Sequence, residues 1–355
     1  MIRGFFIALM LAGAGTPAGA GPSASTAQRL AAKEKLLELA VRPPTVAFEA
    51  RKLVVSLYGD KSRAREVRVY YQPPNKWRHD VLDPSGRVVK TIIQKGAKEW
   101  LYQEGAGAVL LRNVTSVRHG EMNRDDLKAL LSANFTISDA GKGTHVGVAT
   151  RGVSLRPRAD AGGRRHIWVD PKTGIVMHRR QANSKGRRVQ ESRITWLNVQ
   201  DSIPDEMFDP RRPNTEIIEE SERPLIKNPE ELAALGFPKS DWRETLPFGY
   251  RLDSVRILKL YDKPIAHFRY SNGLSSFSYF LSPYLIDGRD FKKEGAQGSD
   301  EADAEMTSGS WAGDFLSWKK GKYYYLIVGD VSSAGLKEIR RALEAHSPGE
   351  KNGKP

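Results

Sequence analysis

Short β-type segments, separated by turn residues, fill most of this 355-residue chain. Each segment is rich in Val, Ile, Tyr and Trp, which favour strands, and most end at Gly, Pro, Asn, Asp or Ser. Short turns such as Asp83-Pro84-Ser85-Gly86 join consecutive strands in antiparallel order. The sequence therefore predicts an antiparallel meander in the first half, with strands at 46–58, 66–71, 76–82, 87–94, 99–103, 109–114, 135–138, 144–158, 164–169, 175–180 and 187–199.

One helical pattern precedes the meander and a second interrupts it. Residues 27–41 carry apolar side chains at helical spacing and stop before Pro43-Pro44, and a second helix is predicted from an N-cap at Asn123. We therefore expect residues 21–210 to form one large curved, half-barrel-like antiparallel sheet with covering helices.

A change of composition follows this first domain. Residues 211–245 contain several Pro and Glu residues and read as a linker with a short helix at 229–235. A smaller α+β domain is predicted for 246–346, closed by an amphipathic helix at 333–346, and a flexible tail for 347–355. Within this domain Tyr323 and Tyr325 are expected to share one face of a strand, opposite Tyr324. The predicted fold class is α+β.

The first twenty residues resemble a cleaved signal peptide. Arg3 provides a basic start, an apolar run follows, and Ala18-Gly19-Ala20 offers small residues for cleavage. A membrane anchor fits less well, because a span needs about 20 apolar residues and Thr16-Pro17 interrupts this run. We expect a soluble periplasmic protein.

Nearly all of the net charge of +14 lies in the first domain, where residues 21–210 contribute +13 and residues 211–355 sum to zero. A field of one sign attracts acidic ligands. Export and the lack of a recognised motif argue against nucleic acid, which leaves anionic lipid, lipopolysaccharide, an acidic peptide or an acidic glycan. A basic surface that only keeps the protein soluble is the alternative.

Motifs for catalysis are missing from the sequence. The chain has no cysteine, its seven histidines are not spaced as a helical metal pair, and it has no phosphate-binding glycine loop and no G-x-S-x-G elbow. We therefore expect no enzyme activity, no catalytic residue, no metal and no cofactor. A hydrolase site assembled from distant residues remains the open alternative.

Aromatic residues in the predicted strands are the candidate ligand-binding side chains. A large curved sheet with few helices leaves part of one face uncovered, and an uncovered apolar face is a ligand site. The candidates are Trp77, Trp100, Tyr102, Trp168 and Trp196. The alternative is that these rings are ordinary core residues beneath the two helices.

Three motifs of the first domain resemble the strand pattern of the lipoprotein carriers LolA and LolB, a pattern that the RseB/MucB regulators share. They are the runs 69–78, 98–102 and 167–174. Three further runs, 246–250, 270–278 and 326–331, resemble the C-terminal domain of RseB/MucB, which the carriers do not have. The sequence as a whole therefore resembles the RseB/MucB family of periplasmic sigma-E regulatory proteins.

The resemblance implies a non-enzymatic regulator of the envelope stress response. Such a protein binds the periplasmic domain of an anti-sigma factor and senses lipid-like or lipopolysaccharide ligands. The alternative is a periplasmic carrier of lipid or of lipoprotein acyl chains. We further expect the C-terminal domain and its junction with the first domain to bind the protein partner. The acidic part, Asp300 to Glu305, of the loop at 295–309 is expected to be dispensable for folding.

Overall fold

The computed structural model describes residues 24–345 apart from 59–60, 106–107, 114–123, 160–162, 184, 212–215, 220–224, 240–241, 261–262, 285–313 and 330. Four sequence predictions lie outside the described residues: the signal peptide, the N-cap at Asn123, the acidic loop at 295–309 and the C-terminal tail. None of the described helices is long and apolar enough to cross a membrane.

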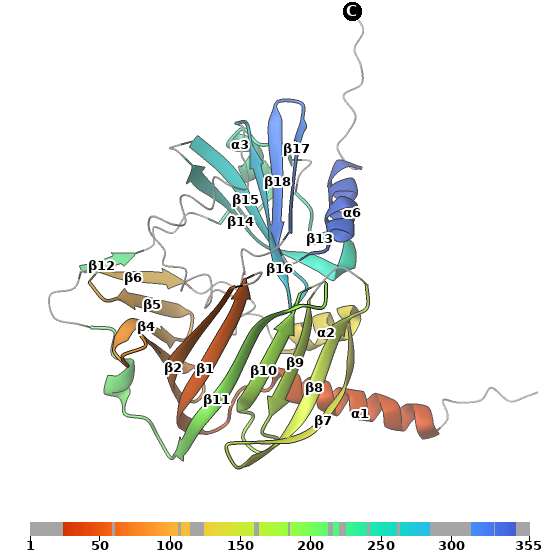
Figure 1. The fold of residues 1–355 in the computed structure, drawn as a ribbon. Coiled ribbons are helices and arrows are strands. Elements are labelled where there is room, and N and C mark those ends of the chain that lie inside the picture. The colour runs from red at the N-terminus through yellow and green to blue at the C-terminus, as the bar shows by residue number, and fades with distance from the viewer. Residues whose placement is uncertain are drawn as a thin grey trace, which may run out of the picture.

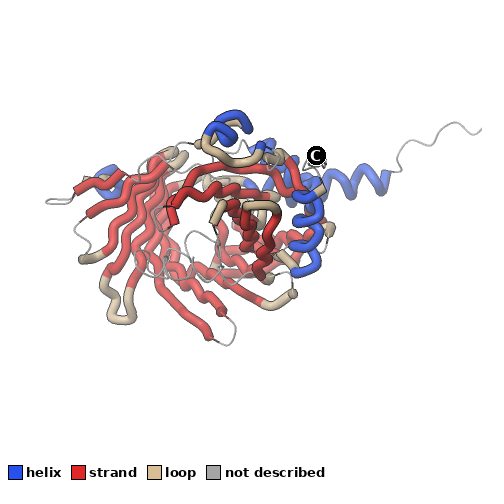
Figure 2. The backbone as a smooth tube through the Cα atoms, turned by 90° about the horizontal axis from the view of Figure 1, so that it is seen from above, coloured by secondary structure: helices blue, strands red, loops and turns tan. Residues whose placement is uncertain are grey.

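A large curved sheet and a smaller sheet form the molecule, which confirms the predicted α+β class (Figure 1). The large sheet has twelve strands in the order β12-β6-β5-β4-β3-β2-β1-β11-β10-β9-β8-β7. Seen from above, its strands follow a curved path (Figure 2). The strands are β1 (Ala47–Tyr58), β2 (Lys61–Gln72), β3 (Lys76–Leu82), β4 (Val88–Lys95), β5 (Lys98–Gln103), β6 (Ala108–Asn113), β7 (Phe135–His145), β8 (Val148–Pro157), β9 (Arg164–Val169), β10 (Val176–Ala182), β11 (Arg188–Gln200) and β12 (Glu216–Glu219).

Strand β12 departs from the sequence prediction. It lies in the predicted linker and pairs with β6 in parallel, whereas the other pairs of the large sheet are antiparallel. Four residues carry too little periodicity to signal a strand, and this one is defined by backbone pairing with a strand about a hundred residues earlier. The chain between the two sheets is thus partly built into the first. The domain limits drawn from the sequence stay a prediction.

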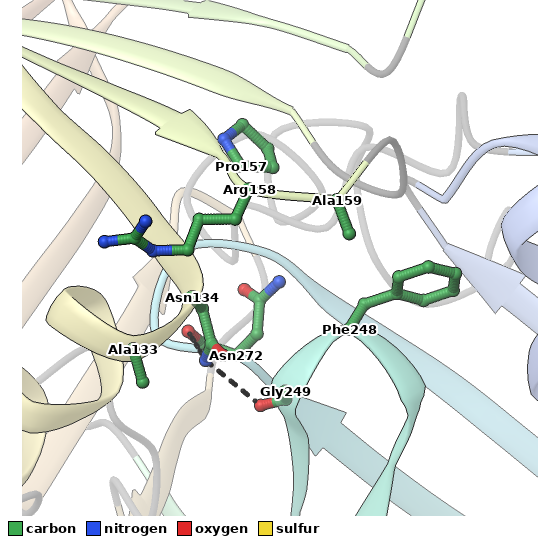
Figure 3. A pocket seen from close by; sticks show the side chains of 8 residues that line it. All are labelled: Ala133, Asn134, Pro157, Arg158, Ala159, Phe248, Gly249 and Asn272. Carbon is green, nitrogen blue, oxygen red and sulfur yellow. Dashed lines mark hydrogen bonds between the residues drawn. The ribbon is translucent and has the colours of Figure 1, made fainter.

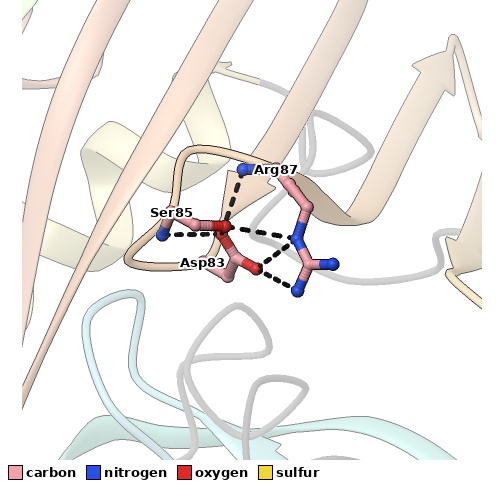
Figure 4. Close-up of polar contacts among 3 residues, drawn as sticks. All are labelled: Asp83, Ser85 and Arg87. Atoms are coloured by element: carbon pink, nitrogen blue, oxygen red, sulfur yellow. Dashed lines mark hydrogen bonds and ion pairs between the residues drawn. The ribbon is translucent and has the colours of Figure 1, made fainter.

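The turn between β3 and β4 is the predicted hairpin connection (Figure 4). The Gly86 amide donates to the Asp83 carbonyl at 2.9 Å, and Gly86 has φ of +83°. The Asp83 carboxylate accepts hydrogen bonds from the Ser85 hydroxyl at 2.6 Å and from the Arg87 amide at 3.0 Å. These hydrogen bonds, that from Ser85 first, lower the pKa of Asp83 to about 2.

A second hairpin was missed in the sequence. The predicted strand 144–158 is the end of β7, a two-residue turn and all of β8. Val146 has φ of +50° and Gly147 has φ of +76° in this turn. A β-branched residue rarely adopts positive φ, so Val-Gly is a poor turn signal, and the pairing of the two long strands outweighs that local preference.

Helices α1 (Ala24–Val41) and α2 (Arg124–Asn134) cover one end of the large sheet. Leu37 of α1 and Leu131 of α2 are buried in a cluster with strand residues from β7, β8 and β9. A short 3₁₀ helix, η1 (Asp205–Phe208), packs on β3 and β4. The helices therefore leave the middle of the sheet, around β1, β10 and β11, to other neighbours.

The smaller sheet has six strands in the order β13-β14-β15-β16-β18-β17. These are β13 (Thr245–Leu246), β14 (Tyr250–Leu260), β15 (Lys263–Ser271), β16 (Ser276–Ser282), β17 (Asp314–Lys320) and β18 (Tyr323–Gly329), with helices α3 (Pro229–Ala234), η3 (Pro247–Gly249) and α6 (Ser333–Glu344). Leu336 and Ile339 of α6 are buried in the same cluster as Tyr325, with Tyr323 packed against it, while Tyr324 packs on the other face. The predicted division of the three tyrosines is confirmed.

Candidate binding site on the large sheet

Alternate residues of each strand lie on two faces of the large sheet. Ile167 and Val169 of β9 pack in the cluster that contains Leu37 and Leu131 from the helices. We call the face that carries these two residues the helix-side face, and the opposite one the outer face. Cross-strand pairing assigns the residues of the other strands to one face or the other.

The five predicted aromatic residues are divided between these faces. Trp77 lies on the helix-side face, where its ring centroid is 4.1 Å from that of Tyr71. The other four lie on the outer face. One row of cross-strand pairs there runs through Tyr102, Thr91, Asp80, Arg68, Arg51 and Trp196.

Trp100 and Tyr102 lie under the helix η1. Tyr102 is buried in a cluster with Phe208 and Ile203, and Trp100 packs against that cluster. The Tyr102 hydroxyl donates a hydrogen bond to the Pro210 carbonyl. Both rings therefore help to fix the chain that leaves β11 for the smaller sheet.

Trp168 lies among three histidines. Its ring stacks on His178 at 4.7 Å between centroids, with His166 at 6.3 Å and His145 at 6.1 Å. Burial is the first cause that lowers the pKa of each of the three imidazoles, so they are mainly neutral near pH 7. His178 Nε2 lies 2.7 Å from a carboxylate oxygen of Glu191.

Trp196 is the exposed member of the set. Its side chain is 41% exposed, and the Arg51 guanidinium lies 5.9 Å from the ring centroid. The structure thus brings Trp100 and Tyr102 together and leaves Trp77, Trp168 and Trp196 in three other environments. A ligand-binding role for these five residues stays a prediction.

A basic strip crosses the middle of the helix-side face. Cross-strand pairing places one row through Arg65, Val54, Ser192, Arg179 and Ile167. The next row contains Lys90, Val81, Val67, Lys52 and Ile194. A third row contains Arg63, Ser56, Gln190, Gln181 and Arg165. These three rows carry six basic side chains and no Asp or Glu.

Lys52 and Arg179 are the two cations at the centre of this strip, and both are half-buried. Burial, and then the positive charge of Arg179, lowers the pKa of Lys52 to about 8. Burial also lowers the pKa of Arg179. In the part of the chain that the structure describes, neither side chain makes a hydrogen bond or an ion pair. The two charges therefore repel each other in a partly desolvated place.

The junction between the two sheets forms a second feature (Figure 3). The Asn134 side chain, at the end of α2, donates to the carbonyls of Gly249 at 3.2 Å and Asn272 at 3.3 Å. A pocket of about 200 Å³ opens beside it, lined by Ala133, Asn134, Pro157, Arg158, Ala159, Phe248, Gly249 and Asn272. This volume is below the roughly 300 Å³ of a typical small-molecule site. The junction is thus better suited to coupling the sheets than to holding a large ligand.

The sequence contains a signal for the basic strip that composition alone did not reveal. Arg63 and Arg65 stand two residues apart and are followed at the same spacing by Val67 and Val69. In a strand this places the two arginines and the two valines on one face. The placement of Lys52 and Arg179 on one face had no such signal, because the two residues are far apart in the chain.

Among the described residues, no group of three His, Cys, Asp or Glu side chains could hold a metal ion.

Comparison with known proteins defines the class of fold. No family model matches the chain, and no curated protein matches it. Among solved structures, the chain shares its two-sheet α+β architecture with MucB. It is similar to MucB of Pseudomonas aeruginosa, solved as the MucA/MucB complex, with 14% identity, a TM-score of 0.54 and coverage of 86% of this chain and 94% of that chain. A structure of MucB in complex with MucA(peri) gives 14% identity, the same coverage and a TM-score of 0.51.

A LolA superfamily protein from Nitrosomonas europaea also aligns, with 13% identity, 51% of this chain, 96% of its own and a TM-score of 0.27. At 14% identity the MucB structures establish a shared fold. They confirm, at the level of fold, the resemblance to the RseB/MucB family that the sequence motifs indicated.

Proposed function

We propose that this chain is a non-enzymatic periplasmic regulator that binds the periplasmic segment of an anti-sigma factor. The observation that carries the proposal is the match to MucB across both sheets, in structures where MucB is bound to MucA. A carrier domain alone would match only the first sheet. The shared fold extends to 86% of this chain.

Ligand sensing is the second part of the proposal. The +13 net charge of residues 21–210 and the basic strip suit an anionic lipid or lipopolysaccharide. The hydrogen bonds of Asn134 to Gly249 and Asn272 connect the large sheet to the smaller one. A ligand that shifts the position of the large sheet would, through these hydrogen bonds, also shift the smaller sheet. We expect the smaller sheet to bind the protein partner.

Carriage of lipid or lipoprotein acyl chains is the second candidate function. It is favoured by the apolar side chains within the basic strip, including the half-buried Val54 and the buried Val67. A carrier would bind lipid and would not bind an anti-sigma segment.

Capture by purified segments distinguishes the two functions. We expect the full chain to retain the periplasmic segment of an anti-sigma factor from its own organism, with MucA(peri) as a heterologous probe. Phe315, on the edge strand β17, is 54% exposed, and exposed aromatic residues are common at protein interfaces. Phe315→Ala is expected to weaken capture about tenfold, equivalent to about 1.4 kcal/mol.

Trp196→Ala provides the matched control, because Trp196 is an exposed aromatic residue on the large sheet. We expect its capture affinity to stay within about twofold of that of the unmodified chain, well below the tenfold loss expected for Phe315→Ala. Binding of lipid without capture of either segment would contradict regulation and support the carrier function.

A further inference from the structure

Two half-buried cations without an anion are an unusual arrangement for a sheet face. Removing a charge from water is costly unless it is paired, so folded proteins normally place a carboxylate beside it. At Lys52 and Arg179 the charges are instead two of the same sign. Such sites occur where a ligand supplies the missing charge.

Alternation along the strands explains why the chain itself does not neutralise the pair. The nearest carboxylates in these strands, Glu66 and Glu191, lie one residue out of phase and so on the outer face. Glu66 pairs there with Arg51, and Glu191 pairs with Arg180 and Arg188 and lies 2.7 Å from His178 Nε2. A strand cannot turn a single side chain to the other face without shifting its register.

The surroundings specify the kind of anion. Lys52 lies between Val67 and Ile194 in its row, which are 4% and 5% exposed, and Val54 is next to Arg179 across Ser192. A fully hydrated small anion would lose its water shell here without gaining apolar contact. An anionic group attached to a hydrocarbon chain satisfies the cations and the apolar side chains together.

We propose that Lys52 and Arg179 together bind the anionic head, carboxylate or phosphate, of a single amphiphile on the helix-side face. The proposal deepens the ligand-sensing part of the proposed function and rests on that part alone. Arg179 offers planar donors suited to two oxygens, and Lys52 supplies a point charge from the other side of β11. Lys90, in the row of Lys52, and Arg65, in the row of Arg179, extend the positive field on the same face.

Titration calorimetry with sodium oleate tests the proposal on the full chain. We expect Lys52→Met and Arg179→Met each to weaken oleate binding at least tenfold, while Lys52→Arg retains it. Arg51→Met is the matched control, since Arg51 is the neighbouring residue of β1 on the outer face, and should change oleate affinity less than twofold. Oleyl alcohol, which has the same chain without the charge, should bind the unmodified chain and the two Met variants equally.

Four results would overturn the proposal. The first is an unchanged oleate affinity in folded Met variants, and the second is equal binding of oleate and oleyl alcohol by the unmodified chain. The third is binding of inorganic phosphate as tight as that of oleate. The fourth is that the Met variants lose capture of the anti-sigma segment while they still bind oleate. The last would assign the pair to an acidic polypeptide. A melting curve of each variant tests whether that variant is folded. Capture of the anti-sigma segment by the unmodified chain is measured separately, so failure of the regulatory function and failure of this site are distinguishable.

Discussion

The two sheets bury their apolar residues in different ways. The smaller sheet holds one large cluster, in which residues of β14, β15, β16, β17 and β18 pack with α3 and α6, and a small cluster of three buried residues on its other face. The large sheet divides its buried residues among three separate clusters, and half-buried Lys52 shares a cross-strand row with members of one of them. The smaller sheet therefore concentrates its packing in one place, whereas the large sheet spreads its packing over separate places and combines it with half-buried cations.

The strongest test of this difference is a cavity in the smaller sheet. Phe268 is fully buried in its cluster. We expect Phe268→Ala to lower the free energy of unfolding by about 3 to 5 kcal/mol, because the transfer free energy and the cavity both count. Val54→Ala, in the basic strip of the large sheet, should cost about 1 kcal/mol, because Val54 is half-buried and loses fewer atoms. Equal losses in chemical denaturation would contradict the comparison.

The junction between the sheets should show an intermediate effect. Gly249 has φ of +69°, and an added Cβ would lie 1.8 Å from the Asn134 amide oxygen. Gly86 has φ of +83° with no atom within 4 Å of the added Cβ. Gly249→Ala is expected to cost about 2 kcal/mol or more, and Gly86→Ala about 1 kcal/mol for backbone strain alone.

The difference between the two glycine variants isolates the contact between the sheets. Differential scanning calorimetry measures both on the full chain. If the two variants lost the same stability, the side chain of Asn134 would be free to move aside and would not fix the junction.

The smallest expected change in the free energy of unfolding is an increase, whereas the changes above are losses. Removing the charge of Lys52 relieves its repulsion with Arg179, so Lys52→Met should raise the free energy of unfolding by about 1 kcal/mol at pH 7. Arg51→Met on the outer face should change it by less than about 0.5 kcal/mol, as expected for an exposed pair. A destabilising Lys52→Met would show that the strip is structural.

The same lysine predicts a pH dependence. Folding lowers the pKa of Lys52 from 10.5 to about 8, so the unfolded chain binds more protons between these values. The contribution of Lys52 to stability therefore rises with pH from about 8 to 10.5. The other basic groups of the three rows are Lys90, which is also titratable, and Arg63, Arg65, Arg165 and Arg179. We expect a rise in urea midpoint over this range in the unmodified chain and a smaller rise in Lys52→Met.

Local sequence determined most of the strands, the two covering helices, the hairpin turn at Asp83 and the division of Tyr323 from Tyr324. These features depend on side-chain periodicity and on turn residues, which act over a few positions. Three features depended on contacts between distant residues instead. Strand β12 forms by parallel pairing with β6, the turn at Val146 is imposed by two long partner strands, and Trp77 lies on the opposite face from the other four candidate aromatic residues.

The charge of the first domain was also evident from the sequence, but its arrangement was not. Counting residues gives +13 without saying which cations have carboxylate partners. Only the register of β1, β11 and β10 places Lys52 and Arg179 on one face and turns Glu66 and Glu191 to the other. A one-residue change of register would reverse these faces, so the candidate anion site is decided by the tertiary pairing of strands that are more than a hundred residues apart in the chain.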